Sequence, residues 1–414
     1  MNPLRSLRSR YAFIQGNFLI LLISWVLMFF SGPIPSTYSS LYFKGLGAND
    51  FIIGVIGFAG SMALAFVQFP GGLLADQHGR RWLVVTMTFG VTFAVAFFIL
   101  APSWHFIVLG TAIQNFCLLY QPALFAIMID SVSPEHRGTG FTLQWAITNL
   151  VSLPAAIIAG YLILAFDVDL GTRIAYAIVL VFYLAGAVLR TKLKETLPSN
   201  NKASRPDLWG AFRDYPKAVK EGLQVWKKVP RATLYLFAVN SSMNSILAGC
   251  NMFFVIYAIN VLQVTKFQWA IVMAFMFLSS AIPTILAGWR MDIAGRKHFY
   301  LLSFLLYLPA MVIFLRANFA LLLVSFFLFG LGQMLQNTSY NSILGDLTPR
   351  ELRGKVIGCG QFFMYIGQAF AQLLVAALYT YVAPELPFIL LAAAVIPLST
   401  IALMKVHEPS TRQV

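Results

Sequence analysis

Two short charged blocks occur twice in this chain, each pair 216 residues apart. The first reads GLLADQHGRR at 72–81 and GWRMDIAGRK at 288–297, and the second reads DSVSPEHRG at 130–138 and DLTPRELRG at 346–354. Carboxylates and guanidinium groups form strong charge-assisted hydrogen bonds, and a carboxylate also stabilises the positive N-terminus of a helix. The blocks therefore predict ion pairing at helix ends. Their common offset indicates a duplicated unit.

The elements that must position these blocks are membrane-spanning helices. Hydrophobic residues make up 59% of the 414 residues and charged residues only 11%, against about 25% charged in soluble domains. Apolar runs recur that are long enough to cross a hydrocarbon core of about 30 Å. We predict an all-α membrane protein with twelve spans at 13–43, 51–75, 82–101, 106–130, 140–166, 172–190, 232–260, 267–291, 298–316, 319–346, 356–383 and 388–405.

The distribution of Lys and Arg predicts the orientation of these spans. Lys and Arg favour the cytoplasmic side of short loops, and placing the N-terminus inside puts 25 of them inside and 4 outside. We therefore expect a multi-pass cell-membrane protein with both termini cytoplasmic. Its predicted parts are a tail at 1–12, six-helix bundles at 13–190 and 232–405, a cytoplasmic linker at 191–231 and a tail at 406–414. The net charge of +14 follows from this topology, and no nucleic-acid partner is expected.

The linker carries a basic amphipathic pattern. This predicts a helix, kinked at Pro216, that lies on anionic lipids at the cytoplasmic face; the alternative is a solvated linker. Its apolar positions are Leu208, Trp209, Phe212, Val219, Leu223 and Trp226, and its basic positions are Arg213, Lys217, Lys220, Lys227 and Lys228.

The repeated pattern G-x-x-x-D-x-x-G-R-[RK], with a D…P…RG pattern two helices later, resembles the signature loops of the major facilitator superfamily. The second copy departs from the pattern at Arg290 and Met291. The resemblance covers essentially the whole chain. It implies a transporter of two pseudo-symmetric six-helix bundles, with the substrate site between them near the membrane midplane.

The charged blocks then form a candidate conformational latch. The resemblance implies that Asp76 meets the start of the eleventh helix near Val356 and that Asp292 faces the fifth near Gly140. We expect Arg80 and Arg81 to reach Asp130, and Arg296 to reach Asp346, only when the halves close at the cytoplasmic side. The alternative is that these charges only set topology. The full candidate set is Gly72, Asp76, Gly79, Arg80, Arg81, Asp130, Arg137, Asp292, Arg296, Asp346 and Arg353.

The predicted cavity is neutral. None of the 15 acidic residues falls near the centre of a span, and no Lys or Arg is evident there. Neutral polar residues instead share helix faces, where they line a cavity or, alternatively, bond between helices. The cavity candidates are Gln114, Asn115, Gln121, Trp145, Asn149, Asn240, Asn244, Asn251, Gln333, Gln336, Asn337, Tyr340, Gln361, Tyr365 and Gln368.

These features favour a secondary transporter for a small neutral or amphipathic organic solute. Efflux by alternating access is the first reading, and a facilitator or proton-coupled uptake carrier for a sugar-like metabolite is the second. A transporter-like receptor is the alternative of another class. No metal-ligand cluster, nucleophile with its base or phosphate loop is present in the sequence. We therefore expect no enzyme activity, no cofactor and no metal. We also expect a monomer.

Overall fold

Helices make up nearly all of the described chain. The structure is a computed structural model that describes residues 13–133, 137–197, 213, 215–348 and 353–407, and none of these lies in a strand. Before the linker the helices are α2 (Gly16–Ser31), α3 (Pro33–Ser36), α4 (Ser39–Gly45), α5 (Asp50–His78), α6 (Arg80–Ile99), α7 (Trp104–Cys117), the short 3₁₀ helix η1 (Leu118–Tyr120), α8 (Gln121–Asp130) and α9 (Arg137–Arg190). We call α2–α9 the N-half.

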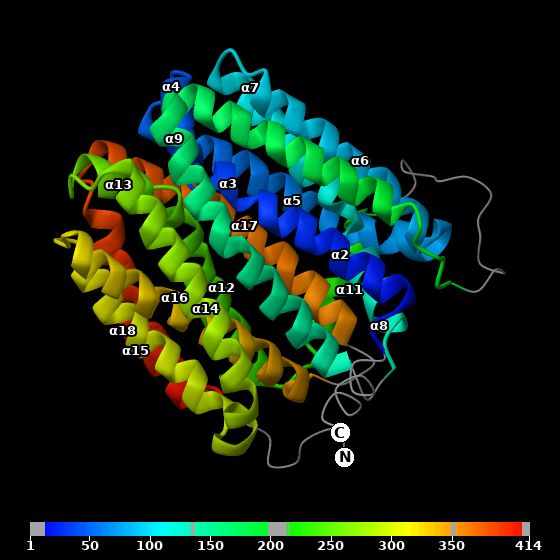
Figure 1. The fold of residues 1–414 in the computed structure, drawn as a ribbon. Coiled ribbons are helices and arrows are strands. Elements are labelled where there is room, and N and C mark those ends of the chain that lie inside the picture. Colours follow the sequence, from blue (N-terminus) through cyan, green and yellow to red (C-terminus); the bar gives the residue numbers. More distant parts are fainter. Residues whose placement is uncertain (1–12, 134–136, 198–212, 214, 349–352, 408–414) are drawn as a thin grey trace, which may run out of the picture.

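After the linker helix α11 (Tyr215–Trp226) comes a second set of helices, which we call the C-half. It consists of α12 (Arg231–Asn251), α13 (Phe254–Asn260), α14 (Lys266–Ala294), α15 (Arg296–Phe314), α16 (Phe319–Leu347), α17 (Arg353–Tyr381) and α18 (Leu386–Lys405). Figure 1 shows the helices running up and down in one bundle, with α17 beside α5 and α14 beside α9.

Helix α9 replaces two predicted spans. Its 54 residues contain a single non-helical residue, Asp167, at φ 60° and ψ −177°. A straight helix of that length would measure about 80 Å, far more than the membrane core. The chain instead doubles back at Asp167, and the second limb runs along α6 (Figure 1). The predicted break between 166 and 172 was therefore too long, because one residue suffices for the turn.

Nine described helices are long and apolar enough to cross a membrane, or ten if α12 and α13, bent by 42°, count as one span. The predicted number of twelve stays a prediction. Two other predicted spans are also interrupted. The first is divided into α2, α3 and α4, and the fourth into α7, η1 and α8.

The bundle has two ends. We call the end where α2 begins and α18 finishes the terminal end, and the opposite one the distal end. One buried cluster joins the halves near the distal end, with Tyr38, Ile53 and Ala159 packed among residues of the C-half such as Phe254 and Ala270. A second cluster, around Phe18, Trp25 and Leu124, belongs to the N-half alone.

Candidate functional site

Hydrogen bonds join the two halves at the distal end. The Tyr38 hydroxyl donates to the Lys266 carbonyl oxygen at 2.5 Å, and the Trp269 indole N–H donates to the Thr37 carbonyl at 3.2 Å. Deeper in the bundle, Ser61 donates to the Gln372 side-chain oxygen at 3.0 Å, and both residues are buried. These bonds connect the first two crossings of the N-half to α14 and α17. We call this set of contacts the distal seal.

Close backbone approach makes the distal seal tight. A Cβ atom built on Gly54 of α5 would lie 2.3 Å from the Ala376 Cβ and 2.8 Å from the Gln372 carbonyl oxygen on α17. The ring pairs Phe51–Tyr381 and Phe58–Phe370 flank this crossing, with centroids 5.8 Å apart in each. Only glycine permits such proximity, so the α5–α17 contact depends on a residue that the sequence reading did not single out.

The terminal end carries the ion pairs of the charged blocks. Arg80 pairs with Asp130, and Arg296 pairs with Asp346. Both contacts match the expected partners, but each lies within one half. The expectation that they form only when the halves close is therefore wrong, because α6 and α8 are neighbours in one bundle, as are α15 and α16. Arg81 also departs from expectation, since its guanidinium donates to the Thr191 carbonyl at 2.7 Å.

Glu195 holds the start of α6 in place. Its carboxylate accepts from the backbone N–H groups of Arg80, at 3.3 Å, and Arg81, at 3.0 Å. Burial alone would raise the pKa of this carboxyl, but backbone donors from Leu197, Arg81, Thr196 and Arg80 outweigh it and hold the pKa below its usual value. Sequence reasoning missed Glu195; an acidic residue soon after a helix end gives little signal by itself.

Gly79 has a local role beside this carboxylate. It adopts φ 102° between α5 and α6, and its repeat partner Gly295 adopts φ 91° between α14 and α15. These values suit glycine and let one helix follow the next without a loop. A Cβ at Gly79 would also lie 2.8 Å from the Glu195 Oε2 atom. The positive φ therefore explains why glycine occurs at this position in both copies of the repeat.

Several latch candidates lie outside what the structure describes. The backbone at Gly72, Asp76, Arg137, Asp292 and Arg353 is helical, but their side chains are not among those described. The contacts expected for Asp76 and Asp292 across the halves therefore stay predictions.

Five of the cavity candidates come together in one pocket near the terminal end. Its volume is about 220 Å³, and α12, α16, α17 and α11 line it. We call it the amide pocket. Its lining residues are Trp226, Phe237, Asn240, Asn244, Asn337, Tyr340, Asn341, Leu344, Val356, Ile357, Gly360, Gln361 and Met364. None of them carries a charge, so the pocket is neutral, but it lies in the C-half and linker alone and not between the halves.

The amides of this pocket have unused hydrogen-bonding capacity. Among the described residues, no side-chain partner is present for Asn337 or Gln361. Asn244 and Asn341 each donate to the carbonyl four residues earlier on their own helix, both at 2.9 Å, which leaves their side-chain oxygens available. Four neutral amides can thus offer donors and acceptors to an occupant.

Behind the pocket wall, a buried chain of hydrogen bonds fixes Asn240. The Tyr307 hydroxyl donates to the Gln336 side-chain oxygen at 2.8 Å, and the Gln336 amide donates to the Asn240 side-chain oxygen at 3.1 Å. Tyr340 also hydrogen bonds to Asn240. Gln336 was a cavity candidate, but it is buried and joins α12, α15 and α16. Gln336 therefore agrees with the alternative prediction, in which polar residues form hydrogen bonds between helices.

The other cavity candidates do not line the amide pocket. In the N-half, Asn115 donates to the Thr111 carbonyl at 2.8 Å and Asn149 to the Trp145 carbonyl at 2.9 Å, so both amides are engaged by their own helices. The candidates outside the pocket are Gln114, Asn115, Gln121, Trp145, Asn149, Asn251, Gln333, Gln336, Tyr365 and Gln368.

One basic side chain lies inside the N-half, contrary to expectation. Arg190 is 1% exposed, although it stands in the last turn of α9. Its guanidinium donates to the Ser24 hydroxyl at 3.1 Å and the Thr88 hydroxyl at 2.9 Å, and it lies 5.3 Å from the Tyr120 ring centroid. Side chains tilt towards the N-terminus of their helix, which takes this one into the bundle. The predicted span 172–190 ends at this residue, but its burial inside the bundle was not predicted.

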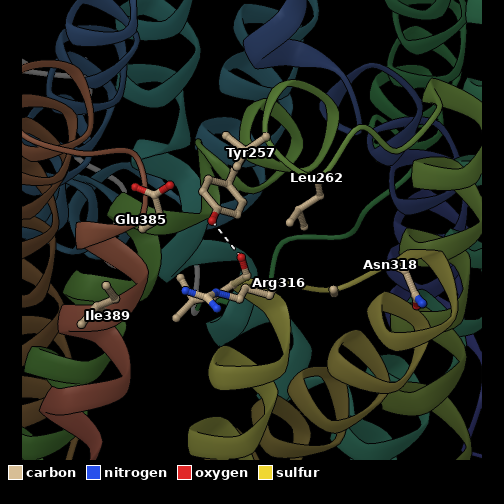
Figure 2. Close-up of a pocket in the computed structure, with 9 residues that line it drawn as sticks. Tyr257, Leu262, Arg316, Asn318, Glu385 and Ile389 are labelled. Atoms are coloured by element: carbon tan, nitrogen blue, oxygen red, sulfur yellow. Dashed lines mark hydrogen bonds between the residues drawn. The ribbon is translucent and has the colours of Figure 1, made fainter.

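A larger hollow of about 650 Å³ opens at the distal end of the C-half. Figure 2 shows Arg316 and Glu385 in its wall, with Tyr257 donating to the Leu315 carbonyl at 2.9 Å. No sequence-predicted cavity residue lies there. It belongs to the opposite end of the C-half from the amide pocket.

Comparisons with known proteins agree with this architecture. The family model described as Major Facilitator Superfamily matches residues 16–292 and 243–414. A multi-drug resistance efflux pump PmrA homolog of Lactococcus lactis is 23% identical over 393 residues, covering 87% of this chain and 88% of the relative. An uncharacterised MFS-type transporter, YqjV of Bacillus subtilis, is 25% identical over 195 residues, covering 47% and 43%.

Solved transporters share the fold at low sequence identity. A POT family transporter in complex with 5-aminolevulinic acid has a TM-score of 0.74 and 15% identity, covering 93% of this chain and 95% of its own. The nucleoside transporter NupG has a TM-score of 0.71 and 13% identity, covering 95% and 100%. With the family match spanning the whole described bundle, the chain belongs to the major facilitator superfamily and is a multi-pass membrane protein that acts as a secondary transporter.

Proposed function

We propose that this transporter exports small neutral or amphipathic organic solutes by alternating access. The observation that carries the proposal is the amide pocket, where Asn337 and Gln361 have unused hydrogen-bonding groups among uncharged and aromatic neighbours. An ionic solute would lose its hydration there without a compensating charge. A neutral solute with polar groups and an apolar body would be bound favourably, and the similarity to a multi-drug efflux pump supports the outward direction.

The orientation follows from the basic residues, which favour the cytoplasmic face. We infer that the terminal end faces the cytoplasm. An inward-facing state is then supported by the distal seal, which joins the halves at the opposite end, and by the amide pocket, which lies near the terminal end. Exposed Lys220, Lys227 and Lys228 beside this end support contact with anionic lipids, and a monomer suffices for the cycle.

A rocking motion of the halves would break the distal seal and close the terminal end. We propose that Asp76 and Asp292 stabilise that closed terminal end. Replacement of Asp76 by Asn should slow transport several-fold and leave solute binding largely intact. Asp130→Asn is the matched control, because its pair with Arg80 lies within one half and does not need contact between the halves. Transport by the Asp76→Asn protein at the wild-type rate would end the latch proposal.

Reconstitution into liposomes tests the proposed function directly. Purified protein is assayed with chloramphenicol as a neutral ring-bearing solute, mannitol as a ringless polyol and ethidium as a cation, with and without a pH gradient. We expect saturable movement of the neutral ring-bearing solute. Movement of mannitol alone would favour the uptake carrier for sugar-like metabolites, and movement of none of the three would contradict the proposal. Acceleration by the gradient would indicate proton coupling, and no effect would indicate a facilitator.

A further inference from the structure

Helix α11 of the linker packs against the transport domain. It contacts α17 of the C-half and α5 of the N-half. Gly222 and Val225 are buried on this helix, whereas Leu223, expected on the apolar face, is 47% exposed. Pro216 is the second residue of α11, and residues 198–212 and 214 lie outside the part of the chain that the structure describes, so the predicted kink stays a prediction. The helix therefore buries part of its surface against protein and does not only rest on lipid.

Trp226, the last residue of α11, forms one wall of the amide pocket. Its ring centroid is 4.7 Å from that of Phe237 on α12. A Cβ atom built on Gly360 of α17 would lie 3.4 Å from the indole Cζ2 atom. The indole is thus held between α12 and α17, the two helices that carry Asn240 and Gln361.

The Trp226 N–H is a buried donor that has no oxygen or nitrogen partner among the described residues, and the side chain placed to accept from it is the Cys359 thiol. The neighbouring Cys359 thiol is fully buried, and sulfur is a weak acceptor. A buried indole N–H ordinarily finds a partner. With only a weak sulfur acceptor beside it and unused amides in the adjoining pocket, this N–H can donate to an oxygen or nitrogen acceptor of a bound molecule.

We propose that Trp226 is a solute-contacting lid of the amide pocket, so that the linker forms part of the binding site. This inference rests on the proposed function. The preferred solute is neutral, has a flat ring to stack on the indole and an acceptor for its N–H, and bonds to Asn337 and Gln361. Solute passage at the terminal end then requires α11 to leave α17.

The rate at which Cys359 is labelled by a maleimide tests the Trp226 lid without any solute. A protein with Cys117→Ser and Cys250→Ser retains Cys359 as its only cysteine. In liposomes, N-ethylmaleimide should label it slowly but completely, because the lid opens. Trp226→Ala should raise the labelling rate at least tenfold, whereas Trp82→Ala, the same change at an exposed tryptophan of α6, should not. An unchanged rate in Trp226→Ala, or no labelling of Cys359 in the otherwise wild-type protein over hours, would overturn the lid.

A second pair of variants covers the possibility that Trp226→Ala fails to fold. Gly360→Ala places a methyl group 3.1 Å from the Phe237 ring and 3.4 Å from Trp226, whereas a Cβ at Gly358 meets nothing within 4 Å. Gly360→Ala should raise the Cys359 labelling rate several-fold, and Gly358→Ala should leave it unchanged. Equal rates in the two variants would contradict the packing of Trp226 on α17.

Transport measurements test the contact with solute. Trp226→Phe keeps a ring but removes the N–H, and should raise the KM for chloramphenicol about two- to tenfold with kcat unchanged. Trp226→Leu removes the ring as well, and should raise KM further. Unchanged KM values in both variants would refute the solute contact. If the wild-type protein moves none of the solutes, the proposed function and this contact fail together, while the Cys359 labelling still decides whether α11 is a lid.

Discussion

The two ends of the bundle are held together in different ways. At the distal end the halves bind each other, through Ser61 and Gln372, Tyr38 and Lys266, and the close approach at Gly54. At the terminal end the described ion pairs tie each half to itself, Arg80 to Asp130 and Arg296 to Asp346. The ion pairs at the terminal end therefore stabilise each half separately, whereas uncharged contacts at the distal end hold the two halves together.

Loss of Arg190 should have the largest effect, because this residue braces the terminal part of the N-half. Arg190→Ala leaves a cavity and removes bonds to Ser24 and Thr88, which should lower the free energy of unfolding by about 2–4 kcal/mol. Arg190→Met fills the space and should cost less than about 1 kcal/mol, because both hydroxyls already donate to backbone carbonyls of Leu21 and Val84. Thermal unfolding in detergent measures both.

Equal destabilisation by Arg190→Ala and Arg190→Met would change the comparison between the two ends of the bundle. It would mean that the charge, rather than the packing, is required inside the N-half. Arg190 would then be a functional group, and the terminal end would no longer be purely structural.

The next largest effect should come from the distal seal. Gly54→Ala forces a methyl group against the Ala376 Cβ and the Gln372 backbone oxygen. Overpacking of this kind costs about 1–3 kcal/mol, which shifts a two-state population by about 5- to 150-fold. Only the state with the distal seal formed contains the contact between Gly54 and α17, so Gly54→Ala should disfavour that state. A cysteine introduced at position 61 should then react faster with a maleimide applied from the distal side. Transport by Gly54→Ala should fall about tenfold.

Gly45→Ala is the control for this prediction. A Cβ at Gly45, also near the distal end, meets nothing within 4 Å. If Gly45→Ala and Gly54→Ala behave alike, the seal does not depend on close approach between α5 and α17.

Much of this contrast was visible in the sequence. The 216-residue repeat predicted two halves, and the pairing of Arg80 with Asp130 and of Arg296 with Asp346 followed from oppositely charged residues at neighbouring helix ends. The neutral amides of α12, α16 and α17 shared helix faces, and five of them line one pocket. The periodicity of a sequence predicts shared helix faces, because residues three or four apart along a helix lie on the same side of it.

The remainder depends on contacts between distant segments. Nothing near Gly54 shows that it meets Ala376, and nothing near Glu195 shows that it accepts from the start of α6. Arg190 was expected at the end of a span, and nothing near it in the sequence shows that its side chain meets Ser24 and Thr88. Trp226 was read as a lipid-facing residue, since an apolar face indicates burial but not the partner that buries it.

A smaller effect is expected at the terminal end from Glu195. Glu195→Gln should weaken the cap of α6 and lower stability at pH 7 by about 1 kcal/mol. The pKa of Glu195 is lowered in the folded protein, so its stabilisation is present above the unfolded pKa and is lost as pH falls through the folded value. Thermal unfolding of the wild type and Glu195→Gln should therefore converge at acidic pH.

Glu385→Gln controls for a general loss of acidic charge, because Glu385 lies in the distal hollow. It should not reproduce the pH-dependent difference. A stability gap between the wild type and Glu195→Gln that stays constant from pH 7 to about pH 3 would show that the carboxylate charge is not what holds α6.

The smallest effect should come from the one ion pair that joins the two halves at the distal end among the described residues. Lys266 contacts Asp167 at 2.8 Å, but the two side chains are 43% and 81% exposed. Exposed pairs contribute little and are screened by salt. Asp167→Asn keeps a residue that tolerates the positive φ, and should change transport and position-61 labelling by less than twofold. Asp169→Asn, which breaks a pair with Arg173 inside the N-half, is its matched control. A several-fold effect of Asp167→Asn alone, abolished at 1 M salt, would show that charge also holds the halves together at the distal end.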